Sequence, residues 1–151
     1  MKIQEFNEIT DQGYWLSLIK KSDWKAGKYL YELLTTGKFH EIYGQTSKVL
    51  LLTKGKILIA FCTLAEQDDI RDKKMTPWIG FVYTFPQFRR NHYAGKLLEY
   101  SYLKAKKDDY KSIYILTNST GIYEKYGYSF YKIMKDVNGE DSRVYKIDIE
   151  K

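Results

Sequence analysis

The clearest structural signal in this chain lies in residues 78–98, WIGFVYTFPQFRRNHYAGKLL. From Trp78 to Phe85 it is rich in aromatic and β-branched residues, which predicts a strand. Pro86 ends that strand because proline has no N–H to give to a ladder. From Tyr93 onward apolar residues recur at helical spacing, which predicts a helix ending near Lys107. The stretch is therefore a strand, a sharp turn and a helix.

A basic turn separates the predicted strand from the predicted helix. It consists of Arg89, Arg90, Asn91 and His92 and leads directly into the helix N-terminus. The first N–H groups of a helix have no internal partners, and the helix dipole adds partial positive charge there. Such a turn can hold an anion. A purely structural turn with solvated arginines fits the same residues.

Two motifs in this half of the chain resemble those of one protein family. RRNHYA, residues 89–94, resembles the pyrophosphate-binding signature of the GNAT superfamily of N-acetyltransferases, with His92 at the place of its first glycine. Asn118 follows a predicted strand and is itself followed by YEKYGY, residues 123–128, which resembles the closing motif of the same family. The two motifs occur in the family's order, separated by a helix and a strand.

The resemblance implies acetyl-CoA as the cosubstrate. In this family the strand from Trp78 to Phe85 separates at its C-terminal end from Ser112–Leu116, and its free backbone groups bind the amide-bearing arm of the cofactor. The cofactor-binding residues that it implies are Val82, Tyr83, Thr84, Arg89, Arg90, Asn91, His92, Tyr93, Ala94, Gly95, Lys96, Asn118 and Tyr126. No metal site is predicted.

The resemblance also implies catalytic roles. Tyr123 is the expected general acid, because a phenol stays protonated at neutral pH and can donate a proton to a leaving thiolate. The predicted strand carries no acidic residue, so Glu66 or Asp68 in the charged loop that precedes it is the candidate base. Core packing of Tyr123 and a turn role for Asn118 are the structural alternatives. Core packing is the expected role of Cys62.

Composition bounds the class of protein. The chain has 151 residues, the size of one domain, and residues 1–151 are expected to form a single acetyltransferase domain. Its one cysteine excludes an internal disulfide. The N-terminus does not resemble a signal peptide, so we expect a cytoplasmic protein. The formal net charge is +6, but the basic residues are dispersed, which argues against a nucleic-acid-binding tail.

The remaining elements follow from periodicity and turn signals. Helices are predicted from residue 13 and over 24–34 and 121–125, and strands over 2–6, 48–53, 56–65, 112–116, 128–134 and 143–149. Residues 39–45 stay unassigned, and 66–75 are predicted to be a charged loop. The order β-αα-ββ-β-α-β-α-ββ is a mixed α/β arrangement, which agrees with the GNAT fold.

These observations predict an N-acetyltransferase in which an amine attacks acetyl-CoA directly in a ternary complex. The acceptor would be a small-molecule or peptide amine, with no nucleic acid and no membrane as partner, and a homodimer is compatible with the resemblance. The alternative is a catalytically inactive GNAT-like module that binds acyl-CoA. A basic nucleic-acid binder is a third reading, which the dispersed charge disfavours.

Overall fold

A computed structural model describes residues 1–150 of the chain. The helices and strands are β1 (Lys2–Glu5), α1 (Gln12–Lys20), α2 (Lys25–Thr35), α3 (Phe39–Tyr43), β2 (Lys48–Lys54), β3 (Ile57–Ala65), β4 (Trp78–Thr84), α4 (Tyr93–Lys107), β5 (Ser112–Leu116), β6 (Ser129–Lys135) and β7 (Asp141–Asp148). Short 3-10 turns cover Phe6–Glu8, Pro86–Phe88 and Glu124–Tyr126.

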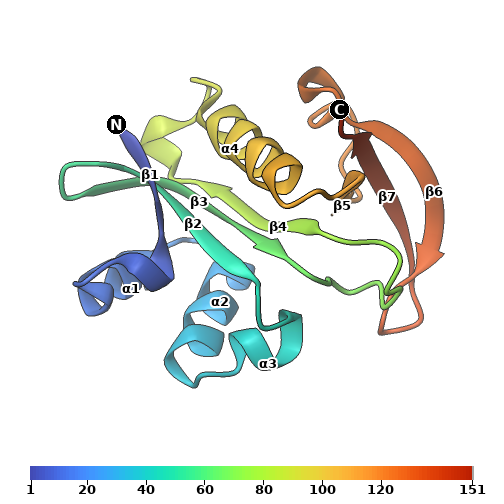
Figure 1. Ribbon diagram of the computed structural model, residues 1–151. Helices are drawn as coiled ribbons and strands as arrows, with labels where there is room; N and C mark the ends of the chain where they lie inside the picture. The colour runs from blue at the N-terminus through green and yellow to red at the C-terminus, as the bar shows by residue number, and fades with distance from the viewer. Residues whose placement is uncertain (151) are drawn as a thin grey trace.

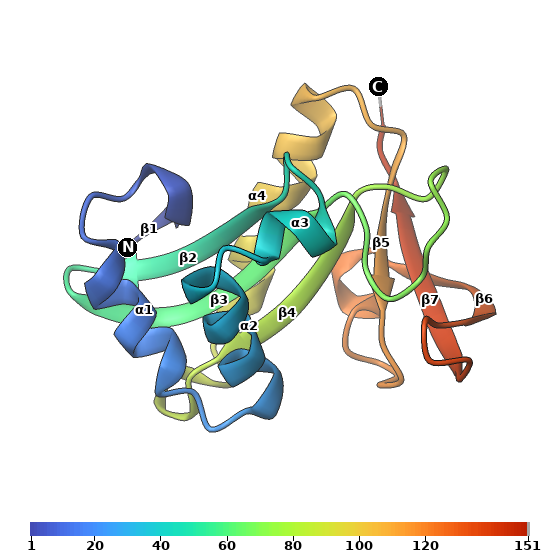
Figure 2. The ribbon, with the colours of Figure 1, turned by 90° about the horizontal axis from the view of Figure 1, so that it is seen from below.

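One seven-stranded mixed sheet forms the centre of the protein. Its strand order is β1-β2-β3-β4-β5-β7-β6, with β4 and β5 parallel and the other neighbours antiparallel. Helix α4 covers one face of the sheet, and α1, α2 and α3 cover the other (Figure 1). Figure 2 shows these three helices lying across β2, β3 and β4. The predicted mixed α/β fold is confirmed.

The two faces of the sheet build two hydrophobic cores. Successive side chains of a strand point to opposite faces, and in β2 Leu50 and Leu52 pack toward α4 while Val49 and Leu51 pack toward the N-terminal helices. A strand buried on both faces reads as a continuous apolar run. The same rule places the buried Cys62 in the α4 core, as expected.

Two local elements differ from the expectation. Residues 39–45, which carried no clear pattern, contain α3, because Phe39 and Tyr43 are one helical turn apart and both enter the core, with ring centroids 5.5 Å apart. The helix predicted over 121–125 is instead a 3-10 turn at Glu124–Tyr126. The Glu124 carboxylate accepts a hydrogen bond from the N–H of Gly121 at 3.0 Å and so closes a loop where a helix was expected.

Strand β4 leaves its neighbour β5 soon after it begins. The two strands pair only at Trp78 with Tyr114 and at Ile79 with Ile115. On its other side β4 stays paired with β3 as far as Thr84. The expected separation of these strands is therefore present, and it leaves one side of β4 without a strand partner. Within residues 1–150, no helix combines the length and the apolar character needed to cross a membrane.

Candidate functional site

The diverging strands enclose a groove of about 860 Å³, called here the β4–β5 groove. It is lined by Asp23, Trp24, Ile79, Gly80, Phe81, Val82, Tyr83, Thr84, Arg89, Arg90, Ile115, Leu116, Thr117, Ser119, Ile122, Tyr123 and Lys125. A groove along a strand that lacks a neighbour exposes backbone donors and acceptors, so it can accept an extended, amide-bearing ligand as an added strand.

Strand β4 is irregular where it borders this groove. The register with β3 shifts between Phe61 and Thr63, which is the mark of a β-bulge. Phe81 lies within this bulge and has φ 50°, a left-handed conformation that bulky residues rarely adopt. The bulge interrupts the pairing of β4 with β3 between Gly80 and Tyr83, and Val82 and Thr84 line the groove.

Two arginines stand at one end of the β4–β5 groove. The Arg89 Nε donates to the carbonyl of Thr84 at 2.8 Å, and its guanidinium carbon lies 5.4 Å from the ring centroid of Tyr83. Both contacts hold Arg89 against β4. Arg90 also lines the groove and adopts a left-handed φ of 69°. This end of the groove is suited to a polyanion.

The turn after Arg90 leads into α4 through a left-handed residue. His92 has φ 56°, a conformation that glycine adopts without steric penalty. The His92 Nδ1 lies 3.4 Å from the hydroxyl of Tyr126. A Cβ built on Gly95 would lie 2.7 Å from Cε1 of Tyr126, so that ring packs where glycine leaves room. The expected first glycine is therefore replaced by a histidine in a glycine-like conformation.

The other residues expected in this turn lie beside the groove without lining it. The Asn91 side-chain amide donates to the carbonyls of Phe88 and Arg89, both at 3.1 Å, and so closes the turn on itself. The other expected cofactor-binding residues here form the first turn of α4, and they are Tyr93, Ala94, Gly95 and Lys96. The structure thus brings Arg89 and Arg90 to the groove and sets the helix N-terminus next to them.

Tyr123 lines the groove and packs partly into the α4 core. Burial is the main cause that raises the pKa of Tyr123 to about 12, and the neighbouring Cys62 and Tyr126 add to the rise. The phenol therefore keeps its proton at every physiological pH. Its ring centroid lies 6.3 Å from that of Tyr128, whose buried hydroxyl has no hydrogen-bond partner in the part of the chain that the structure describes.

Asn118 is exposed and does not line the groove. Its neighbours Thr117 and Ser119 do. These two hydroxyl residues and Asp23, which precedes α2, are groove residues that the sequence did not predict. Trp24 also lines the groove. The Tyr83 hydroxyl donates to the Asp23 carboxylate, which ties β4 to the start of α2. No local motif marks Asp23, because its partner is 60 residues away.

Of the two candidate bases, Asp68 is the one beside the groove. A Cβ on Gly80 would lie 2.7 Å from its Oδ2, so the carboxylate can lie this close to β4 only because Gly80 has no side chain. Burial is the main cause that raises the pKa of Asp68 to about 7, and the charge of Asp69 adds to it. The Asp69 N–H donates to Asp68 Oδ1 at 2.7 Å and opposes the shift.

Asp68 lies in a second cavity that adjoins the groove. This cavity of about 480 Å³ is called here the aspartate pocket. It is lined by Trp24, Ala26, Tyr29, Tyr43, Asp68, Asp69, Gly80, Phe81, Leu116, Val137 and Asn138. Four of these residues, Trp24, Gly80, Phe81 and Leu116, also line the β4–β5 groove. A carboxylate that titrates near neutral pH beside a ligand groove can take a proton from a bound group.

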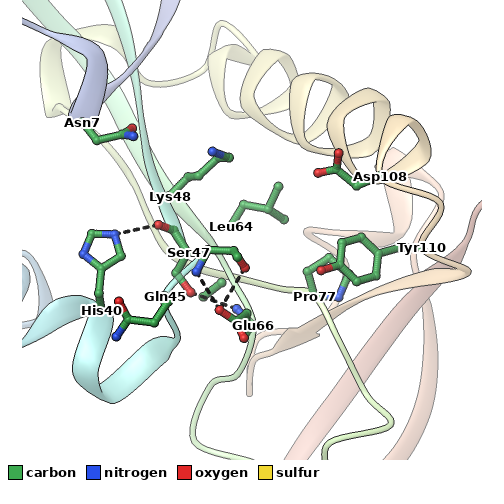
Figure 3. Close-up of a pocket in the computed structure, with 12 residues that line it drawn as sticks. Asn7, His40, Gln45, Ser47, Lys48, Leu64, Glu66, Pro77, Asp108 and Tyr110 are labelled. Carbon is green, nitrogen blue, oxygen red and sulfur yellow. Dashed lines mark hydrogen bonds between the residues drawn. The ribbon is translucent and has the colours of Figure 1, made fainter.

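Glu66 faces a different cavity. It lines a pocket with His40, Lys48 and Tyr110 (Figure 3), none of which lines the β4–β5 groove. Its Oε2 accepts hydrogen bonds from the backbone N–H of Thr46 at 2.7 Å and from the Thr46 hydroxyl at 2.9 Å. The structure therefore does not bring Glu66 together with Tyr123 and Asp68.

Comparison with known proteins places this geometry in context. The sequence pattern described as "Acetyltransferase (GNAT) domain" matches residues 3–131. A search of curated protein sequences finds no match.

Solved structures share the fold. A GNAT family acetyltransferase from Elizabethkingia anophelis with acetyl-CoA bound has 22% identity and a TM-score of 0.65, covering 97% of each chain. The aminoglycoside 6'-N-acetyltransferase from Enterococcus faecium has 14% identity and a TM-score of 0.71, covering 100% of this chain and 98% of that one. An aminoglycoside 6'-N-acetyltransferase complexed with coenzyme A has the same identity, coverage and TM-score. At these identities the likeness is one of fold.

Proposed function

The chain belongs to the GNAT acetyltransferase family, and from this premise we propose that it transfers an acetyl group from acetyl-CoA to the amine of a small molecule. The β4–β5 groove is the observation that carries the proposal. It runs along a strand whose pairing with β5 ends at Ile79, and it has Arg89 and Arg90 at one end. Family membership makes the activity that of an acyltransferase. The bound coenzymes of the similar structures support acetyl-CoA as the cosubstrate.

The groove fits this cosubstrate in charge and shape. Arg89, Arg90 and the adjoining N-terminus of α4 supply positive charge and free N–H groups for a pyrophosphate. The backbone from Val82 to Thr84 supplies donors and acceptors for the amides of the pantetheine arm. When bound, acetyl-CoA supplies an activated thioester at the Tyr123 end of the groove.

Two side chains of this chain would handle the protons. Asp68, whose pKa is near neutral, takes a proton from the incoming ammonium so that the nitrogen carries a free electron pair. Tyr123, which stays protonated, donates its hydroxyl hydrogen to the leaving sulfur. An N–H of β4 donates to the thioester oxygen as negative charge develops there. The amine attacks directly, with no acylated protein side chain.

Tyr123→Phe is the test of the acid role. We expect kcat to fall by about 10²-fold, as removal of a general acid does, while the Kd for acetyl-CoA stays unchanged in calorimetry. Tyr128→Phe is the matched control, since Tyr128 is buried in the same cluster but does not line the groove. Unchanged turnover of Tyr123→Phe would reject its role.

The alternative function, a module that binds acyl-CoA without catalysis, predicts a different result. Binding of acetyl-CoA without release of free thiol, across a broad panel of amines, would support a module that binds but does not transfer. Three expectations stay predictions: a single domain, a cytoplasmic location and a homodimer.

A further inference from the structure

The aspartate pocket lies where an acceptor would meet the acetyl group. It shares Gly80, Phe81 and Leu116 with the β4–β5 groove, at the point where β4 and β5 separate. Asp68 stands at this junction, over Gly80. A molecule in the aspartate pocket would therefore have direct access to the groove. The charge and shape of the pocket walls then determine which acceptors can bind there.

The charge of the pocket is negative, although the chain as a whole carries a formal net charge of +6. Asp68 and Asp69 line it, and among residues 1–150 its lining includes no Lys, Arg or His. The nearby Arg71 lowers the pKa of Asp68 through its charge, but it does not line the pocket, and its Nη1 donates to the carbonyl of Ile42 at 3.0 Å. Two adjacent carboxylates without a cationic partner in the lining disfavour an anionic ligand and favour a cationic one.

Aromatic rings form much of the remaining wall. The ring centroid of Phe81 lies 5.7 Å from that of Tyr43, 6.3 Å from that of Tyr29 and 6.5 Å from that of Trp24. Ring faces attract ammonium groups within about 6 Å of their centroids, most strongly where water is excluded. The same rings pack against alkyl or ring carbons. The wall therefore suits a cation carried on an apolar framework.

The size and closure of the pocket favour a small molecule. Its volume of about 480 Å³ is in the range of small-molecule sites. The turn between β6 and β7 closes one side through Val137 and Asn138, and the Val137 N–H donates to the carbonyl of Asp69 at 2.8 Å. That hydrogen bond ties the wall that carries the carboxylates to the turn that covers them.

We infer that the acceptor is a small amine with at least two positive charges on an apolar or ring framework. One ammonium reaches Asp68 and is acetylated, while a second cationic group pairs with Asp69 among the aromatic rings. The inference rests on the proposed function, because it assigns the acceptor of that same reaction.

The transfer balances as follows. The reacting ammonium gives one proton to Asp68, its nitrogen forms a bond to the acetyl carbon, and the carbon–sulfur bond breaks. The sulfur leaves with the bonding electron pair and takes a proton from Tyr123. The new amide nitrogen loses a second proton, which restores the phenol, and Asp68 releases its proton to solvent. The products are an acetamide, free coenzyme A thiol and one proton.

A matched series of ligands tests the charge rule on the full chain. The probes are 1,4-diaminobutane, butylamine and 4-aminobutanoate, which share a four-carbon chain and differ in the group at the far end. Binding is measured by calorimetry in the presence of coenzyme A, so the readout does not need turnover. The variants are Asp69→Asn and, as a control in the same loop outside the pocket, Asp72→Asn.

We expect the diamine to bind about tenfold more tightly than butylamine, and 4-aminobutanoate to bind most weakly. Asp69→Asn should bring the diamine to the affinity of butylamine and leave butylamine unchanged, while Asp72→Asn alters neither. Equal binding of the three ligands, or a diamine preference that survives Asp69→Asn, overturns the inference. Failure of thiol release with every amine would instead reject the proposed transfer, and the binding ratios would still decide the charge rule.

Discussion

Replacing Asp68 by Asn should make the protein more stable at neutral pH and much less active. The carboxylate is enclosed against Gly80, and burial is the main reason that its pKa rises from 3.8 to about 7. The charged form is therefore disfavoured in the folded state. Asn removes that charge while keeping nearly the same shape, so the folded state no longer bears the cost of enclosing a carboxylate.

The size of the effect follows from the shift. The difference between 3.8 and about 7 is about 3.2 pKa units, and each unit corresponds to about 1.36 kcal/mol, which sets a ceiling of about 4 kcal/mol. The carboxylate retains some contact with solvent, so we expect about 2 kcal/mol. The groups around it that also carry charge or titrate are Asp69, Arg71 and Tyr43.

The sign and the pH window follow from linkage. Because the folded state holds the proton of Asp68 more tightly, stability falls as pH rises from 3.8 to about 7 and is then constant. Asp68→Asn should thus be about 2 kcal/mol more stable than the wild type at pH 8, with a smaller gain at pH 5. Urea denaturation at both pH values measures this, with Asp72→Asn as the control for loss of a loop charge.

The same variant has an activity readout. We expect kcat to fall by about 10²-fold or more, as loss of a general base does, and wild-type kcat/KM to rise with pH through a limb near 7. If Asp68→Asn were no more stable than wild type at pH 8, the carboxylate would not be held in a disfavoured state. If it kept full activity, the role as base would be wrong.

Three further predictions concern the rest of the molecule. Burial alone would raise the pKa of Glu5, but hydrogen bonds from Tyr100, Lys104 and Lys48 lower it from 4.5 to about 2. Glu5→Gln should therefore destabilise the protein by about 3 kcal/mol at pH 7, as measured by urea denaturation. That contribution is present above pH 4.5 and is lost as pH falls through 2, so an equal effect of Glu5→Gln at pH 2 would contradict it. His92 adopts a left-handed conformation that costs a non-glycine residue about 1–2 kcal/mol, whereas glycine loses about 0.5–1 kcal/mol more conformational entropy on folding. His92→Gly should therefore raise the thermal midpoint of unfolding by about 2 °C, and a lower midpoint would contradict the reasoning. Cys62 is fully buried and burial raises the pKa of its thiol to about 12, so a thiol reagent should label it only at the rate of unfolding, and rapid labelling of the native protein would refute this.

Local chemistry was enough to predict most of the framework from the sequence. Pro86 ends β4 because a missing N–H acts at its own position. The helical spacing after Tyr93 predicts α4 with the bounds that the structure has, since periodicity is carried by the residues themselves. Arg89 and Arg90 were found in the same way, because a basic turn before a helix is a contiguous signal.

Contacts between distant segments could not be predicted from the sequence, because they depend on how the chain folds back on itself. Asp68 stands over Gly80 because β3 and β4 run side by side and the loop between them folds back, which no spacing in the loop predicts. Tyr83 meets Asp23 across 60 residues. The near-neutral pKa of Asp68, on which its proposed role as base depends, comes mainly from enclosure, because desolvation depends on everything that surrounds a group in space. The sequence alone therefore predicted most of the elements and the basic turn beside the groove, whereas three-dimensional packing placed Asp68, and not Glu66, in the cavity that adjoins the groove.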